Sequence, residues 1–137
     1  MPFFIDTNIF VAALRGKAPQ VLEQMLKIPP DEICVPHVVV AELRVGASKS
    51  ARPEHHNRLI TVILEPFIVV WPDQESLAHY VEIRAALEQA GKRISEADLW
   101  IAAMTRAAGG TLVTHNLGEF ERVPGLRVVD WLQSTNT

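Results

Sequence analysis

The sequence predicts an α/β fold in which a central, mainly parallel, twisted sheet lies between two helical layers, a three-layer α/β/α arrangement. One pattern in the sequence supports this fold class. Short apolar segments typical of buried strands alternate with longer segments of helical periodicity, and such alternation favours parallel strands joined by right-handed crossovers. The chain has 137 residues without an internal repeat or linker. We therefore expect a single domain over residues 1–137.

Five short segments rich in apolar and β-branched residues are the expected strands. Pro72 closes the third of them, and Gly109-Gly110 precede the fourth. The expected strands are residues 3–5, 32–35, 67–71, 111–114 and 126–129.

The expected helices are marked by their boundary residues as well as by their periodicity. Pro19 and Pro36 suit first helical positions, Asp73 is a good N-cap, and Gly91 is a typical C-terminal stop. The expected helices are residues 9–14, 20–28, 36–49, 54–64, 73–90 and 96–108.

The composition restricts the class of protein. Only one cysteine, Cys34, is present, so a disulfide within the chain is excluded. There is no signal-peptide pattern and no apolar run near the roughly 20 residues that span a bilayer. We expect a cytoplasmic protein without membrane contact.

The formal net charge of −3 is not that of a typical nucleic-acid binder. The basic residues are nevertheless clustered, in residues 44–58 and at Lys92-Arg93. They are either the solvated faces of helices or a basic rim around an acidic centre.

Polar residues follow two of the expected strands. Asp6-Thr7-Asn8 come after the first strand and Asn116 after the fourth. Ligands of open α/β sheets collect at the carboxyl ends of the strands, which makes Asp6 a candidate for a site. The alternative is structural, because Asp and Thr also cap helices and Asn is common in turns.

Two further acids lie in apolar helical segments. Glu42 has no ion-pair partner at helical spacing, since Arg44 is only two positions away, so it faces either solvent or a site. Asp98 opens an apolar helix, and residues 95–98 also resemble a capping box with Asp in place of Glu or Gln.

Together these acids suggest a metal site. Asp6, Glu42, Asp98 and Asn116 can all reach the same edge of one parallel sheet. Three carboxylates at close range repel one another, and without a cation at least one would take up a proton. Oxygen ligands without a Cys or His cluster favour Mg²⁺ or Mn²⁺ over Zn²⁺.

At these residues the chain resembles the PIN-domain ribonucleases and, among them, the VapC toxins of toxin–antitoxin (VapBC) systems. The matching segments follow the order of the family from one end of the chain to the other. They are residues 5–8, 40–47, 91–103, 114–126 and 130–131. The resemblance implies a PIN-like fold for the single domain.

The resemblance also implies the roles of site residues in a metal-dependent endoribonuclease. Asp6, Glu42 and Asp98 correspond to the catalytic carboxylates that hold Mg²⁺ or Mn²⁺. A fourth acid is common at the position of Asn116, so Asn116 is expected only to support the ligands, and Glu119 is the nearby acid that could replace it. Three further polar residues are expected to orient carboxylates or water, namely Thr7, Asn8 and Thr114.

The partners implied are an RNA substrate such as transfer RNA, a cognate VapB-type antitoxin that inhibits the enzyme, and a second copy in a homodimer. The apolar helices at residues 38–47 and 59–64 are candidate partner surfaces or ordinary core. Six basic residues are candidate phosphate contacts: Arg15, Lys17, Lys49, Arg52, Lys92 and Arg93.

Other classes fit less well. A phosphatase of the haloacid-dehalogenase type needs a second Asp where the chain has Asn8. No glycine-rich phosphate loop follows a strand, and the histidines form no zinc-binding pattern. The remaining alternative is a catalytically weak PIN-like protein that only binds RNA or an antitoxin; Asn116 supports it, and the intact acids oppose it.

Overall fold

The computed structural model describes residues 1–133, so the last four residues of the expected domain 1–137 lie outside the described part. All strand pairs of its single sheet are parallel, and the strand order is β3-β2-β1-β4-β5. The strands are β1 (Phe3–Ile5), β2 (Ile33–Pro36), β3 (Ile68–Val70), β4 (Thr111–Val113) and β5 (Arg127–Val129). The expected α/β class with a parallel central sheet is confirmed.

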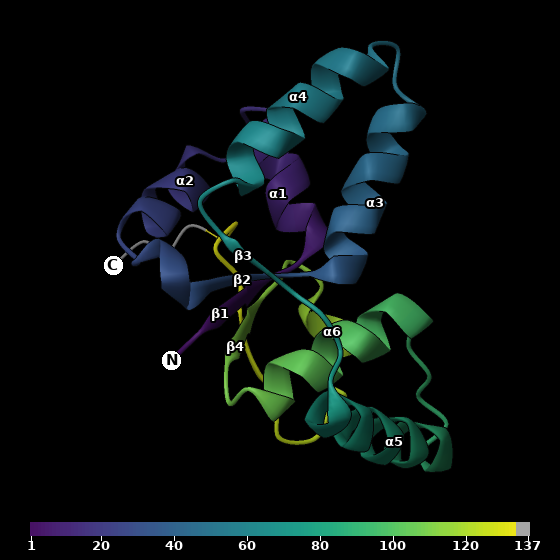
Figure 1. Cartoon of the computed structure of the whole chain (residues 1–137). Coiled ribbons are helices and arrows are strands. Elements are labelled where there is room, and N and C mark those ends of the chain that lie inside the picture. Colours follow the sequence, from purple (N-terminus) through teal and green to yellow (C-terminus); the bar gives the residue numbers. More distant parts are fainter. Residues whose placement is uncertain (134–137) are drawn as a thin grey trace.

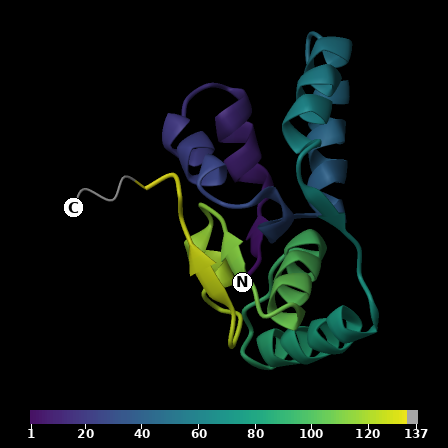
Figure 2. The same ribbon diagram turned by 60° about the vertical axis from the view of Figure 1, so that its left-hand side comes forward.

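Helices cover both faces of this sheet, as expected for a three-layer fold (Figures 1 and 2). Helices α1 to α4 lie on one side, and α5 and α6 lie on the other. The helices are α1 (Thr7–Leu14), α2 (Pro19–Leu26), the short 3₁₀ helix η1 (Pro30–Glu32), α3 (His37–Ser48), α4 (Pro53–Leu64), α5 (Gln74–Gln89), α6 (Glu96–Ala107) and α7 (Leu117–Phe120).

The structure differs from the sequence-based expectation mainly in its shortest elements. The helices η1 and α7 were not expected, because segments of three and four residues are too short to show a helical period. The expected third strand was too long at both ends, and Trp71 lies outside it with 71% of its surface exposed. Helix α1 begins at Thr7, directly after Asp6, rather than at Ile9.

The core is continuous across the sheet because the central strands are buried on both faces. Ile5 on β1 and Ile33 on β2 are completely buried, as are Ile9 and Phe10 on α1. This pattern is typical of a parallel sheet covered on both sides, where strands read as apolar runs rather than as alternating sequences.

The strand order places a topological switch point between β1 and β4. The chain runs from β1 through β2 to β3, then crosses to β4 on the other side of β1. Crossovers therefore leave in opposite directions at this point, which opens a crevice at the carboxyl ends of the two strands. The N–H of Asp6 donates to the carbonyl of Val113 at 2.9 Å, so the ends of β1 and β4 lie side by side.

Helices α3 and α4 form an arm that extends from the sheet (Figure 1). Arg44 on α3 fastens the arm, because its guanidinium donates to the Asn57 carbonyl at 2.9 Å and to the Thr61 hydroxyl at 3.0 Å. Arg44 was counted in the basic cluster of residues 44–58, but these contacts commit its side chain to packing α3 against α4.

Within residues 1–133, no helix combines the length and the apolar character that crossing a bilayer requires.

We predict opposite effects of alanine at two glycines. In α3, a Cβ at Gly46 meets no atom within 4 Å, so Gly46→Ala should raise the free energy of unfolding by about 0.5–1 kcal/mol through helix propensity. At Gly110 a Cβ would lie 2.8 Å from the Pro2 carbonyl and 3.1 Å from the Phe4 ring. Gly110→Ala should therefore lower the free energy of unfolding by about 1–3 kcal/mol. Urea unfolding measures both; equal effects would contradict the packing around Gly110.

Candidate active site

Asp6 stands at the switch point, directly after β1. It is the N-cap residue of α1: its Oδ1 accepts from the N–H of Thr7 at 2.8 Å, and its Oδ2 accepts from the Thr114 hydroxyl at 2.7 Å. Only 5% of Asp6 is exposed. Burial raises the pKa of its carboxyl, and the two hydrogen bonds oppose that rise. Asp6 therefore caps a helix and also faces the crevice.

Asp98 approaches the same place from the first turn of α6. The Ser95 hydroxyl caps this helix by accepting from the N–H of Asp98 at 3.2 Å, so half of the expected capping box is present. Burial, followed by the negative charge of Asp6, raises the pKa of Asp98 to about 6, and Glu119 adds to the rise. The two aspartates are therefore close enough to repel each other.

Glu119 joins this pair through the short helix α7. Its charge raises the pKa of both Asp6 and Asp98. Asn116, the N-cap residue of α7, makes no side-chain capping bond; its N–H donates to the Thr114 hydroxyl at 3.0 Å. Of the two residues considered for the place of a fourth acid, Glu119 is therefore the one whose charge acts on the aspartates.

Glu42 lies at the margin of the group. It is exposed on α3, and its Oε1 accepts from the Thr7 hydroxyl at 3.0 Å. Thr7 thus links Glu42 to Asp6, which Thr7 contacts through its backbone N–H. The charges that act on Asp98 are those of Asp6 and Glu119, and Glu42 is not among them.

These residues fit a hard divalent cation in their donor chemistry. Within residues 1–133, no three His, Cys, Asp or Glu side chains are gathered tightly enough to hold one ion together. Mg²⁺ does not require this, since it usually binds one or two carboxylates and keeps several waters. Asp6 and Asp98 provide such a pair, and their mutual repulsion is the kind that a cation relieves.

A network of polar contacts fixes the loop after β4 against the start of α1. The Oδ1 of Asn8 accepts from the N–H of His115 at 3.3 Å, beside the contact of Thr114 with Asp6. The Nδ1 of His115 pairs with Asp130 at 2.8 Å. Neither His115 nor Asp130 was among the site residues expected from the sequence, although each follows a strand that ends at this edge.

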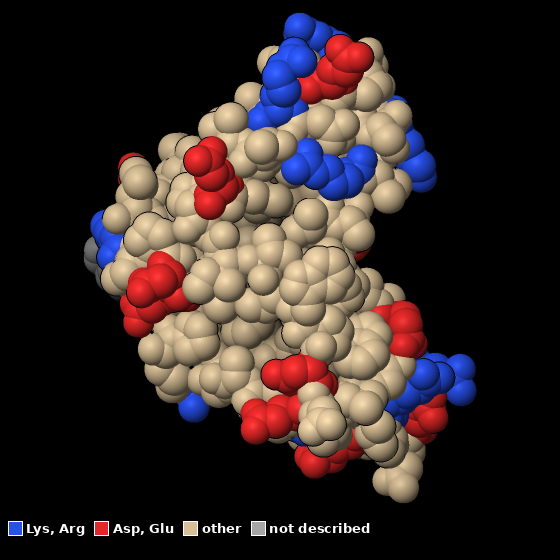
Figure 3. Space-filling model, in the orientation of Figure 1, with Lys and Arg blue, Asp and Glu red and all other residues tan. Residues whose placement is uncertain are grey.

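The candidate phosphate contacts lie in three connecting segments, apart from the elements that carry the acids. Arg15 and Lys17 follow α1, Lys49 and Arg52 lie at the turn between α3 and α4, and Lys92-Arg93 lie between α5 and α6; all are exposed. Figure 3 shows the surface hollowed between the arm of α3 and α4 and the part that carries α5 and α6, with many basic side chains on the arm.

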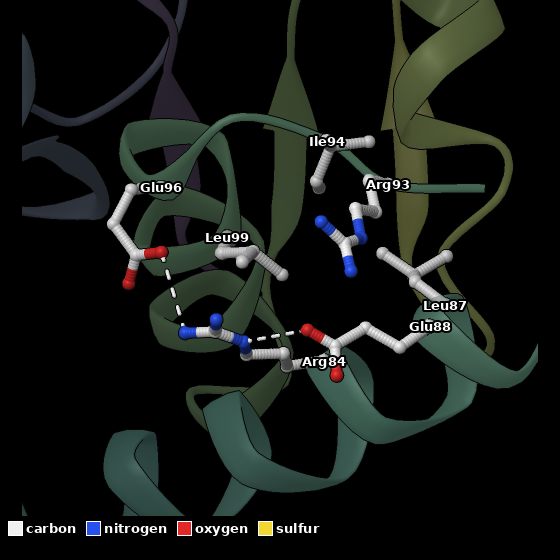
Figure 4. Close-up of a pocket in the computed structure, with 7 residues that line it drawn as sticks. All are labelled: Arg84, Leu87, Glu88, Arg93, Ile94, Glu96 and Leu99. Carbon is white, nitrogen blue, oxygen red and sulfur yellow. Dashed lines mark hydrogen bonds and ion pairs between the residues drawn. The ribbon is translucent and has the colours of Figure 1, made fainter. Parts of the chain in front are cut away.

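A cavity of about 190 Å³ adjoins the start of α6 (Figure 4). Arg84 in its wall contacts Glu88 at 3.0 Å and Glu96 at 3.5 Å. The guanidinium of Arg93 points into this cavity, and within residues 1–133 it forms no ion pair. Of the two arginines here, Arg93 is therefore the one available to a ligand.

A second cavity, of about 240 Å³, lies among α1, α3 and α4. Its lining is mainly apolar, with Glu42 and Arg15 as charged members, and it includes Gly46. Glycine inside a helix costs about 1 kcal/mol relative to alanine, and no atom of the described chain requires it at this position.

Comparison with known proteins gives a consistent result. The family model described as "PIN domain" matches residues 3–126. Ribonuclease VapC2 of Haemophilus influenzae is 35% identical over 132 residues, which are 96% of this chain and 99% of that protein. The tRNA(fMet)-specific endonuclease VapC of Shigella flexneri is 34% identical over 131 residues, 96% of this chain and 98% of that protein.

The fold is also similar to that of a solved complex. A chain in the crystal structure of VapBC2 from Rickettsia felis, bound to a DNA fragment from the promoter, superposes with a TM-score of 0.90. The two chains are 31% identical, with 96% of this chain and 99% of that chain covered.

The raised pKa of Asp98 predicts how stability depends on pH without a metal. The folded protein binds the Asp98 proton more tightly than the unfolded chain, so this contribution to stability is present at about pH 4 and is lost as the pH rises through about 6. Relative to Asp98→Asn, the wild type should therefore lose stability between about pH 4 and 7.

Urea unfolding in chelator across this pH range measures the free energy of unfolding of the wild type relative to Asp98→Asn. The substitution Glu119→Gln should reduce the pH dependence of this difference, because it removes one of the charges that raise the pKa of Asp98. A difference that does not change with pH would contradict the repulsion between the carboxyls.

Proposed function

The chain belongs to the PIN domain family and, within it, to the VapC ribonucleases, and from this premise we propose that it is a metal-dependent endoribonuclease, the toxin of a toxin–antitoxin pair. The observation that carries the proposal is the meeting of Asp6 and Asp98 at the switch point of the sheet, where both are buried and the charge of Asp6 raises the pKa of Asp98. The printed names of the relatives, ribonuclease and endonuclease, support the class of reaction.

The proposed cofactor is Mg²⁺, for which Mn²⁺ can substitute because both ions prefer oxygen ligands. Asp6 and Asp98 would hold it, with Glu42 and Glu119 as the nearest further acids. When bound, such an ion lowers the pKa of a water and offsets charge that develops on the scissile phosphate. Thr114 holds Asp6 in place through its hydroxyl, and Thr7 does the same for Glu42.

The proposed substrate is RNA, with structured RNAs such as transfer RNA as the first candidates. The name of the Shigella flexneri relative supports this choice. An RNA strand that lies in the hollow between the arm and the part that carries α5 and α6 would reach the acids, and exposed basic residues such as those on the arm would neutralise its phosphates. Among them, Arg93 is directed into a cavity beside α6 and is not committed to an ion pair within the described chain.

The proposed inhibitor is a VapB-type antitoxin. Titles of similar solved structures describe VapBC complexes, which supports such a partner. The apolar cavity among α1, α3 and α4 is a suitable place for an antitoxin segment, since Gly46 leaves room there and Glu42 would attract a basic residue. The expected partner surface on residues 38–47 thus includes this cavity.

We also propose that the protein acts in the cytoplasm as a homodimer. Exposed apolar side chains support self-association, because monomers seldom leave several large ones uncovered together. Trp71 is 71% exposed, and Leu77 and Val81, one turn apart on α5, are 52% and 59% exposed.

A catalytically weak protein that only binds RNA or an antitoxin is the alternative function. One observation favours it: an amide, Asn116, stands where a fourth acid is common in the family. The position of Glu119, whose charge reaches both aspartates, reduces the weight of this difference.

The decisive experiment is cleavage of a bulk transfer RNA pool by purified, antitoxin-free protein with Mg²⁺, with Mn²⁺ and with chelator. We expect discrete fragments only with metal, and a loss of about 100-fold or more in Asp6→Asn and Asp98→Asn, because each removes charge from the site that stabilises the transition state. Asp31→Asn, an exposed acid in η1 away from the crevice, is the matched control and should cut like the wild type.

Binding of the same RNA, measured by fluorescence anisotropy, separates the two functions. RNA binding retained by Asp98→Asn without cleavage supports the enzyme. RNA binding without metal-dependent cleavage by the wild type would support the alternative.

A further inference from the structure

His115 and Asp130 form a pair at the rim of the site that none of the proposed roles uses. The Nδ1 of His115 lies 2.8 Å from Oδ2 of Asp130, whose other oxygen accepts from the N–H of Leu132 at 2.8 Å. The Asp130 side chain is only 3% exposed, whereas that of His115 is 58% exposed. A buried carboxylate therefore holds an imidazole that faces solvent.

This pair determines which ring nitrogen is free. An ionised carboxylate only accepts hydrogen bonds. Nδ1 of His115 therefore carries a hydrogen and donates it in the hydrogen bond to Asp130. The Nε2 atom is left for another molecule, and among residues 1–133 it has no hydrogen-bond partner. An aspartate that orients a histidine in this way is a common device where the histidine acts on a ligand.

The position of His115 places its ring beside the acids. It follows Thr114, whose hydroxyl donates to Asp6, and its own N–H donates to Asn8. Asp130 follows β5, the neighbour of β4, so the ring lies at the same carboxyl edge as Asp6. Adjacent strands are about 4.8 Å apart, which puts the pair roughly 5–10 Å from Asp6 along this edge.

We propose that His115 is a substrate-binding residue whose Nε2 hydrogen-bonds an oxygen of the RNA backbone next to the bond that is cleaved. Asp130 is its positioning residue. This inference rests on the proposed ribonuclease function and adds a contact to it. A backbone oxygen is the ligand that fits, because Nε2 accepts from a 2′-hydroxyl when the ring is neutral and donates to a phosphate oxygen when the ring is protonated. Both groups occur at every nucleotide of RNA.

Two conservative variants separate substrate binding from a purely structural role. In His115→Asn the amide can replace Nδ1 and keep the contact with Asp130, but it does not reach the position of Nε2. In His115→Gln the longer amide can reach the position of Nε2. A structural role predicts that Asn is the better replacement, and substrate binding predicts that Gln is.

The experiment measures kcat and KM for the wild type and both variants on an RNA that the wild type cleaves. We expect His115→Asn to raise KM about 10-fold, as for one lost hydrogen bond, with kcat changed less than about 2-fold, and His115→Gln to raise KM less. Asp31→Asn, in η1 before β2 and therefore at the opposite edge of the sheet, is the control and should leave KM unchanged.

Binding of RNA and of DNA of the same sequence to the Asp98→Asn protein identifies the oxygen. If His115→Asn weakens binding of RNA alone, the 2′-hydroxyl is the ligand, and if it weakens both, the phosphate is. The proposal is overturned if KM is unchanged in His115→Asn, or if Asn preserves KM better than Gln. A wild type that neither binds nor cleaves RNA would overturn the proposed function and this inference together.

Discussion

The structure depends on one constraint: a carboxylate, Asp6, is buried where β1 and β4 end side by side. Two hydrogen bonds, from Thr7 and Thr114, hold this charge, and they come from the elements on either side of the switch point. Helix α6 then adds Asp98, and the charge of Asp6 makes it more costly for Asp98 to be charged as well. Asp6 contributes a helix cap, but its burial beside Asp98 has an electrostatic cost that the cap does not explain, and such a perturbed pair is typical of a functional site.

Much of the fold follows from sequence periodicity, because long amphipathic helices and apolar strands each have a distinctive repeat. The parallel arrangement also predicted that Asp6 and Asn116 share an edge, since both follow strands. The order of the strands was not predicted, and it is this order that makes the ends of β1 and β4 neighbours. Helix α7 was missed because four residues carry no periodic signal.

The candidate site was predictable in composition but not in detail. Asp6, Glu42 and Asp98 were treated as equivalent acids, whereas Asp98 is influenced by Asp6 and Glu119, and Glu42 contacts Thr7 at the margin. Such distinctions depend on tertiary packing of α3, α6 and α7, which sequence spacing does not encode. Their roles as metal ligands remain predictions. Arg44 shows the same limit, since an apparent member of a basic cluster fastens α3 to α4.

The most direct test of this account is a crystal structure of the protein grown with Mn²⁺, with anomalous diffraction to locate the ion. The account predicts a peak in contact with the carboxylates of both Asp6 and Asp98 that is absent from crystals of Asp98→Asn prepared in the same way. A well-ordered site without a peak between these two residues, or a peak that persists in Asp98→Asn, would contradict it.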